Sequence, residues 1–370
     1  MHKVGSCARL ISGAVVAVVA ADVSGALAQS PDQSGVVERS RALVPAPPWP
    51  DGDERGMGNT QGPGTWLRCA HHLADPDARI YEISHLRSPT MPVSPFGVPL
   101  EYSFRPTVGL PGTRHAFNGE SASGEAGAQG TQMDAIGHFA HLPEAWDGEG
   151  EFPAGRALYY GGFTQGEVKP APDAPLARLG IDKAPPIITS AVLLDARSHL
   201  GGGEPMAPGQ LITAADIEGM IEAQGLGWRG LLPGDVLYVY TGWEDHWADP
   251  DTEQVYYTKG PGLSYDAAQY LESKAIVLVA LDNPFTDPAN DGQIMGQAPA
   301  PEGTPPDLPF VIHHHNLTQS GIHQIQNAHL AELAADRVWT SCTIILPLRE
   351  QGGSGSPVRP VAIGAPQQGR

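Results

Sequence analysis

Basic residues and cysteines are scarce in this 370-residue chain, and both shortages narrow its possible functions. Lys and Arg together number 22 against 41 Asp and Glu, which gives a formal net charge of −19. A chain this acidic repels phosphate, so we expect no nucleic-acid partner. Charged residues make up only 17% of the chain, too few for a coiled coil, and hydrophobic residues make up 41%, too many for general disorder. The composition predicts an acidic, loop-rich globular protein.

The three cysteines do not form a disulfide scaffold or a zinc motif. Cys7 lies in the N-terminal segment, and Cys69 and Cys342 are far apart in the sequence. In an oxidising compartment the latter two can pair. Two separate buried thiols are the alternative that the sequence favours slightly.

The first 28 residues have the features of a cleavable export signal. Lys3 and Arg9 precede the apolar run 10–21, and Ala26-Leu27-Ala28 forms a small-x-small cleavage site. The run is short for a span of ~20 residues, and Asp22 interrupts it, so we expect no stable membrane span. The segment predicts a periplasmic or secreted protein.

Glycine and proline are abundant, with 45 and 36 residues. Residues 29–55 are rich in Pro and predict a flexible arm. Residues 56–363 contain no linker that would force a boundary, and they predict one domain, followed by a polar tail at 364–370.

Short apolar runs and helical patterns alternate in the second half of the chain. Buried strands are expected at 191–195, 235–241, 275–281 and 343–348, and helices at 214–224, 264–271 and 317–326. This alternation indicates an α/β protein whose sheet is buried on both faces.

The segment 129–138 (QGTQMDAIGH) places Asp134 four residues before His138. A carboxylate and an imidazole this close in sequence can bind a metal or activate a water molecule. A purely structural interpretation is also open, with Asp134 as a helix cap and His138 as an ordinary first-turn residue.

This segment resembles the His-x-Gly-Thr-His-x-Asp-x-x-x-His signature of the cyclase family, which includes bacterial kynurenine formamidases and isatin hydrolases. The likeness continues in blocks at 194–197, 234–237, 241–243, 261–264, 282–283 and 355–360. It implies a single compact swivelling β/β/α domain, usually oligomeric. It also implies a metal-dependent hydrolase of small amides, lactams or lactones that uses Zn or Mn.

Three ligand positions of that family are altered in this chain. Ala128 and Gln132 stand in place of the first and second His, and Gln326 replaces a later Glu. Ala cannot bind a metal, and Gln offers only a neutral carbonyl oxygen. Because Asp134 is the only inherited carboxylate, a two-metal site is electrostatically implausible.

The positions that remain define a candidate site around a single divalent metal. Asp134 and His138 match the family's Asp and last His, so the resemblance implies that Asp134 binds the metal or orients a base and that His138 moves a proton. The family's later His falls at His313 or His314. We take His314, Asp134 and Gln132 as the candidate ligands of Zn or Mn.

Gln132, Gln326 and Trp243 are the candidate substrate-binding residues. The two amides can hold a substrate carbonyl, and Trp243 can wall a pocket, although packing in the core is an equal alternative for the indole. Substitute metal ligands are available near the motif, namely His115, Glu120, Glu125 and His141.

These features predict an arylformamidase-like hydrolase in which water attacks the carbonyl of a small cyclic amide, lactone or N-formyl substrate. We expect a homo-oligomer. Two alternatives stay open. One is a non-catalytic small-molecule-binding protein that kept the fold and lost the metal, and the other is a metal-free lyase or isomerase with His138 as its base.

Overall fold

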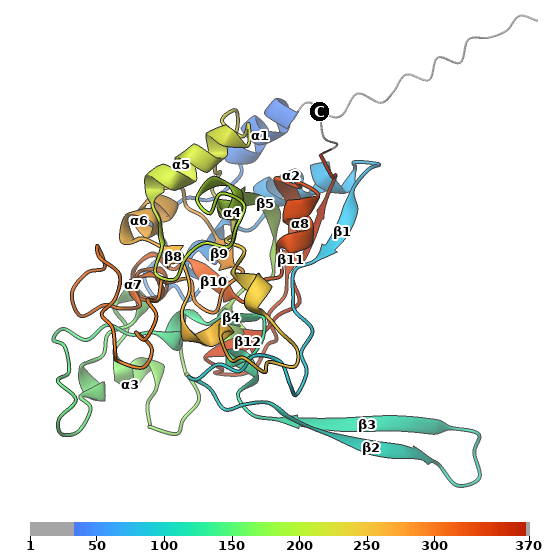
Figure 1. Cartoon of the computed structure of the whole chain (residues 1–370), viewed down its shortest axis with the longest axis vertical. Coiled ribbons are helices and arrows are strands. Elements are labelled where there is room, and N and C mark those ends of the chain that lie inside the picture. Colours follow the sequence, from blue (N-terminus) through green and yellow to red (C-terminus); the bar gives the residue numbers. More distant parts are fainter. Residues whose placement is uncertain (1–32, 368–370) are drawn as a thin grey trace, which may run out of the picture.

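A nine-stranded sheet forms the centre of this computed structural model, which describes residues 33–367 (Figure 1). The strand order is β1-β13-β11-β5-β7-β9-β10-β4-β12. Four central strands run parallel to one another, namely β5 (Ile187–Asp195), β7 (Val236–Tyr240), β9 (Leu278–Leu281) and β10 (His323–Gln326). The flanking strands pair antiparallel, namely β1 (Arg79–Glu82), β4 (Gln132–Asp134), β11 (Thr340–Ile345), β12 (Gly355–Pro357) and β13 (Val361–Gly364).

The central strands are buried on both faces, as their apolar runs predict. Successive side chains of a strand point to opposite faces of the sheet. Along β5, Val192 and Leu194 therefore join one apolar cluster, while Ala191 and Leu193 join the other. The predicted α/β class is confirmed.

Helices cover both faces of this sheet. The first cluster contains side chains of α5 (Ala214–Ala223) and α6 (Tyr265–Ser273), and the second contains those of α8 (Ala331–Ala335). Helix α2 (Pro63–Leu73) packs on the sheet against β5 and β11. The shorter helices are α3 (Gln165–Val168), α4 (Ala196–His199) and α7 (Val311–His314). The start predicted for α5 is confirmed, because Thr213 accepts a hydrogen bond from the Asp216 amide and Asp216 accepts one from Thr213 in return.

The helix predicted at 317–326 is wrong. A π-helix occupies His315–Ser320, and Gly321 then leaves it with a φ of 69°. A Cβ at Gly321 would lie 2.7 Å from the Cα of Gly56, so the chain can turn there only with glycine. The remaining residues form β10, because β9 and β4 offer them a backbone partner on each side.

The predicted arm at 29–55 is partly helical in the structure. Helix α1 (Gln33–Arg41) packs on α2, where Arg68 donates a hydrogen bond to Ser40 over 3.2 Å. Trp49 packs against the core. The predicted export signal at 1–28 lies outside the described residues.

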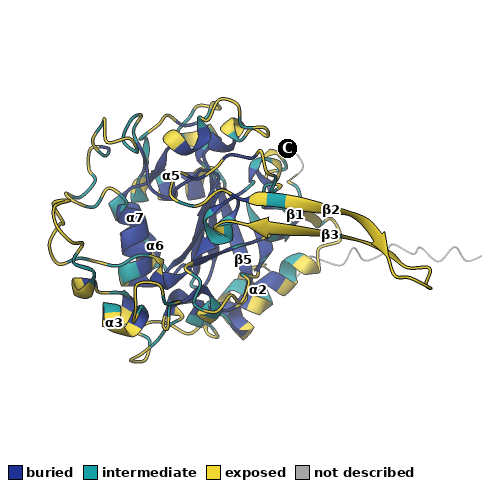
Figure 2. Ribbon diagram, turned by 90° about the horizontal axis from the view of Figure 1, so that it is seen from below, coloured by how far each residue is buried: buried dark blue, intermediate teal, exposed yellow. Residues whose placement is uncertain are grey.

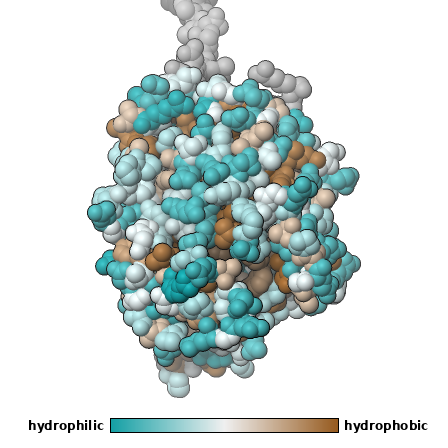
Figure 3. All heavy atoms as spheres, turned by 90° about the vertical axis from the view of Figure 1, so that its left-hand side faces the viewer, coloured by the Kyte–Doolittle hydropathy of each residue, from teal (hydrophilic) through white to brown (hydrophobic). Residues whose placement is uncertain are grey.

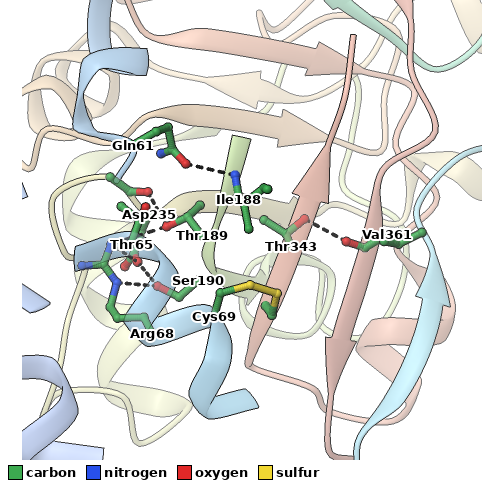
Figure 4. Close-up of a disulfide and its surroundings, with 12 residues drawn as sticks. Gln61, Thr65, Arg68, Cys69, Ile188, Thr189, Ser190, Asp235, Thr343 and Val361 are labelled. Carbon is green, nitrogen blue, oxygen red and sulfur yellow. Dashed lines mark hydrogen bonds and ion pairs between the residues drawn. A yellow bond between two sulfur atoms is a disulfide. The ribbon is translucent and has the colours of Figure 1, made fainter. Parts of the chain in front are cut away.

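A disulfide joins Cys69 of α2 to Cys342 of β11, so the prediction of two separate thiols is wrong (Figure 4). The figure shows a buried ionic group beside it. Asp235 pairs with Arg68 at 3.4 Å and with Arg229 at 2.9 Å. The covalent and ionic links together fasten α2 to the sheet.

A two-stranded hairpin, β2 (Glu101–Gly109) and β3 (Ala116–Ser123), projects from this body (Figures 1 and 2). It is exposed along most of its length, including Phe104 and Phe117. The face shown in Figure 3 is mostly hydrophilic, with apolar residues scattered over it. Between residues 33 and 367, no helix has the length and apolar character needed to cross a membrane.

The stability of this fold should fall as the pH drops below 6.5. Burial lowers the pKa of His323 from 6.5 to about 4, so on acidification the unfolded state takes up this proton before the folded state does. Stability is therefore highest above pH 6.5 and declines between pH 6.5 and about 4. Urea unfolding at pH 7.5 and 4.5 measures this loss in the free energy of unfolding. In the His323→Gln variant the loss between the two pH values should be smaller by on the order of 3 kcal/mol.

His199→Gln is the matched control, because this imidazole is exposed and should leave the pH dependence unchanged. An equally steep pH dependence in the His323 variant would show that this residue is not responsible.

Candidate functional site

The short strand β4 places two polar side chains on one face of the sheet. Gln132 and Asp134 are two residues apart and so share a face, while Met133 between them is fully buried in the apolar cluster on the other face. On β12, Gly355 lies opposite Asp134. A Cβ at Gly355 would lie 2.8 Å from the backbone oxygen of Gly127, so glycine lets the chain at Gly127 pack closely against β12 beside the site.

The neighbouring strand β10 adds two more polar side chains to the same face. Gln326 pairs directly with Gln132 across the strands, and Gln324 lies two residues earlier. Both side-chain amides donate to Oδ2 of Asp134, Gln326 over 2.7 Å and Gln324 over 2.9 Å. All four residues thus form a polar floor, in which Asp134 is the only charge.

His313 of α7 lies over this floor. Its Nε2 is 3.5 Å from Oδ2 of Asp134 and 3.2 Å from Nε2 of Gln326. Its Nδ1 contacts Oδ2 of Asp287 at 2.5 Å, and the same carboxylate accepts hydrogen bonds from the backbone amides of Ile312 and His313. Asp287 therefore fixes the orientation of the ring.

The pKa values of two imidazoles in this region are shifted in opposite directions. Burial would lower the pKa of His313, but the hydrogen bond and charge of Asp287, together with the charge of Asp134, raise it overall. Burial lowers the pKa of His138, and this effect outweighs the negative charge of Asp134, which would raise it. His138 follows β4 and faces the cavity described next, where solvent reaches it, and its lowered pKa favours the neutral, proton-accepting form at neutral pH.

One cavity of about 630 Å³ is lined by Gln132, Asp134, His138, His313 and Gln326. Its wall is aromatic and consists of Phe96, Phe139, Phe285 and Phe310. Phe96, Phe285 and Phe310 pack edge to face with ring centroids 5.8–6.0 Å apart, and Phe139 lies 5.1 Å from the ring of His313. A polar floor and an apolar wall suit a small, flat ligand that carries a carbonyl or an amide.

The cavity also fits the single divalent cation that the family resemblance implies. Oδ2 of Asp134 and Nε2 of His313 face each other, and Asp287 backs the imidazole as outer-shell carboxylates back metal-bound His. The side-chain oxygens of Gln132 and Gln326 are buried and have no hydrogen-bond partner. One carboxylate, one imidazole and neutral amide oxygens form a donor set that accepts Mn²⁺ or Zn²⁺.

The structure brings together most, but not all, of the residues predicted for the site. His138, Asp134, Gln132 and Gln326 line the cavity. His314 does not reach Asp134, because its Nε2 contacts Nδ1 of His141 at 3.0 Å. Of the two neighbouring histidines, His313 is the one beside Asp134.

Trp243 lies in the core and not in the cavity. It is 2% exposed, packs with Tyr256 and donates its indole N–H to the backbone oxygen of that residue. Of the predicted substitute ligands, Glu125 lines the cavity but accepts a hydrogen bond from the Val98 amide, while His115 and Glu120 belong to the region of the exposed hairpin.

Neither the phenylalanine wall nor the support that Asp287 gives to His313 was predicted from the sequence. Phe139 follows His138 directly, and Asp287 lies close after the Asp282-Asn283 block, so both were near recognised motifs. Phe96 and Phe310 carry no such signal. A separate group with metal-ligating donors, His85, Glu244 and His329, was also missed.

Comparison with known proteins identifies the family of this chain. The family model described as "Putative cyclase" matches residues 81–288. A search of curated proteins found no match. The structure is similar to a crystal structure described as a novel cyclase, with a TM-score of 0.68, 23% identity and coverage of 85% of this chain and 97% of that chain.

Two isatin hydrolases are similar at lower scores. One, bound to the product analogue thioisatinate, has a TM-score of 0.53 and 18% identity, with coverage of 80% and 96% of the two chains. Isatin hydrolase A from Ralstonia solanacearum has a TM-score of 0.50 and 17% identity, with coverage of 80% and 95%. The family model spans more than half of the sequence and the folds agree, so this chain belongs to the cyclase family.

Proposed function

We propose that this protein is a hydrolase that opens a small cyclic amide, or cleaves a related lactone or N-formyl group, by attack of water on the carbonyl carbon. One observation carries the proposal: His138, the Asp134–His313 pair and two amide side chains meet in one cavity of about 630 Å³. Membership of the cyclase family and the likeness to isatin hydrolases support it.

The lining of the cavity suggests a substrate with an aromatic ring fused or attached to the reacting amide. Phe285 and Phe310 offer edges and faces against which a flat ring can pack. The unpartnered side-chain oxygens of Gln132 and Gln326 can accept hydrogen bonds from a substrate N–H. Leaving these buried acceptors without a donor costs free energy, so a substrate that has an N–H gains affinity.

His138 is the proposed base. Its neutral imidazole accepts a proton from water as the water oxygen bonds to the carbonyl carbon. The C–N bond then breaks, and the imidazolium returns the proton to the leaving nitrogen. The carboxylic acid that forms releases its remaining proton to solvent, so hydrolysis leaves a carboxylate and an amine, joined in one molecule when the substrate was cyclic. The base is restored to its starting form.

Asp134 and His313 would hold a divalent cation, with the amide oxygen of Gln132 or Gln326 that the substrate N–H leaves free as a further ligand. When bound, such a cation polarises a carbonyl and acidifies water. The protein residues themselves fix the carbonyl over the floor, and the phenylalanine wall restricts the access of bulk water.

His138→Ala should lower kcat/KM by about 10²–10⁴-fold, the usual contribution of a general base. The assay follows the hydrolysis of a panel of aryl lactams, lactones and formanilides by the purified protein. His199→Ala serves as the control, because that exposed imidazole is not part of the cavity.

Undiminished turnover in the His138 variant would refute the mechanism. Absence of turnover on the whole panel, combined with tight binding of a small aromatic acid, would favour a binding protein on this fold.

Gln326→Glu should make the fold depend on a cation. The new carboxylate would lie where Nε2 of Gln326 now lies, 2.7 Å from Oδ2 of Asp134, and like charges this close repel. We expect a lower Tm without metal, recovery of Tm on addition of MnCl₂, and Mn²⁺ affinity above that of the unmodified protein. Calorimetric titration measures the affinity.

Gln254→Glu adds the same charge at an exposed position and should change neither quantity. A Tm that does not respond to Mn²⁺ in the Gln326 variant would count against a cation at this floor.

We also propose that the protein is exported. The disulfide between Cys69 and Cys342 supports this, because disulfides persist in oxidising compartments. Expression of the full chain in a bacterium should yield periplasmic or secreted protein that starts at Gln29, which N-terminal sequencing checks. Mature protein that retains Met1 would contradict the proposal.

A further inference from the structure

A second group of metal-ligating side chains lies apart from the catalytic cavity. His85, Glu244 and His329 each present one donor atom, and the three atoms lie within 4.8 Å of one another. They come from three segments far apart in sequence, and none of the three residues lines the cavity of about 630 Å³. The mechanism proposed above uses none of them.

We propose that His85, Glu244 and His329 bind one divalent cation of the zinc class. His₂Glu is a donor set that holds zinc in proteins, usually with water in the remaining position. Oε2 of Glu244 is 2.5 Å from Nδ1 of His329 and 3.8 Å from Nε2 of His85. With Zn–ligand distances of ~2.0–2.2 Å, tetrahedral donor atoms are about 3.4 Å apart, a value that lies between these two separations.

The unpartnered nitrogen of His85 is the second observation that points to a ligand. The His85 side chain is only 9% exposed, and its Nε2 is buried without any hydrogen-bond partner. A buried polar atom in this state is uncommon in native proteins and calls for a missing group.

The surroundings hold the three donors in place. The His85 ring stacks on Trp247 with centroids 4.2 Å apart, and the other oxygen of Glu244 accepts a hydrogen bond from the Leu330 amide. The backbone of Ser84 bridges to Ala328, next to His329. Little rearrangement is therefore needed to close the donors around an ion.

Charge and access also favour a cation. Asp282 is fully buried, and its carboxylate accepts a hydrogen bond from the backbone amide of Glu244, so two acidic residues lie close together here. A cation bound by Glu244 would offset the negative charge of these two carboxylates. A surface depression of about 710 Å³, which His85 helps to line, offers an entry path and room for a bound water.

Zinc titration of a protein whose cavity site has been weakened tests the proposal. Asp134→Asn removes the only charge of the polar floor, and the full-length variant is stripped with a chelator and titrated with ZnCl₂ by calorimetry. We expect it to bind one equivalent of Zn²⁺ and to gain thermal stability. Co²⁺ in place of Zn²⁺ should give the visible absorption of a tetrahedral site.

His85→Phe is then added to this background. Phe retains the stacking on Trp247, and His85 Nε2 has no protein partner to lose, so the fold should persist. We expect the Kd for Zn²⁺ to rise at least about tenfold, because even the loss of a residue that only supports a ligand typically weakens metal affinity by that factor. The gain in Tm on addition of Zn²⁺ should disappear. His199→Phe is the matched control and should leave both values unchanged.

The proposal would be overturned if the Asp134→Asn protein bound Zn²⁺ with equal affinity with and without His85→Phe. It would also be overturned if the Asp134→Asn protein bound no stoichiometric Zn²⁺ at all. If His85→Phe lowers the Tm without metal, His329→Gln replaces it in the same comparison, because the amide can still contact Glu244. The readouts are binding and stability, so they are independent of whether the cavity is hydrolytic.

Discussion

The pairing of β4 with β10 and β12 is the constraint on which the site depends. β4 is only three residues long, but its register sets Gln132 opposite Gln326 and Gly355 opposite Asp134. A slip of one residue would move Asp134 into the apolar cluster that holds Met133 and would put Met133 in the cavity. The backbone hydrogen bonds of three strands thus decide which side chains can act on a ligand.

The rigid part of the fold lies beside this site. The parallel strands β5, β7 and β9 are packed on both faces and carry no group that touches the cavity. The functional groups come instead from β4 at the antiparallel margin, from the adjoining parallel strand β10, and from α7, where Asp287 anchors the ring of His313. A packed core that holds a polar margin suits the precise placement that carbonyl chemistry requires.

Apolar periodicity and motif spacing predicted part of the fold and part of the site. The strands around 191–195 and 235–241, the helix after Thr213 and the Asp134–His138 pair were all readable. β10 was not, because His323–Gln326 contains a single apolar residue, and its strand state depends on β9 and β4. The sequence could not separate His313 from His314 either, since adjacent residues on a helix point about 100° apart and only tertiary packing shows which one faces Asp134.

The replacement of family ligands by glutamine has a physical consequence for this chain. A Glu at 326 would need a cation to neutralise its repulsion from Asp134, whereas Gln326 donates a hydrogen bond to the same oxygen. Gln also keeps a carbonyl oxygen, which can accept from a substrate or bind a cation weakly. The polar floor can therefore be fully folded before any ligand arrives. Folding and cation binding, which are coupled in a carboxylate-rich site, become separate events at this one.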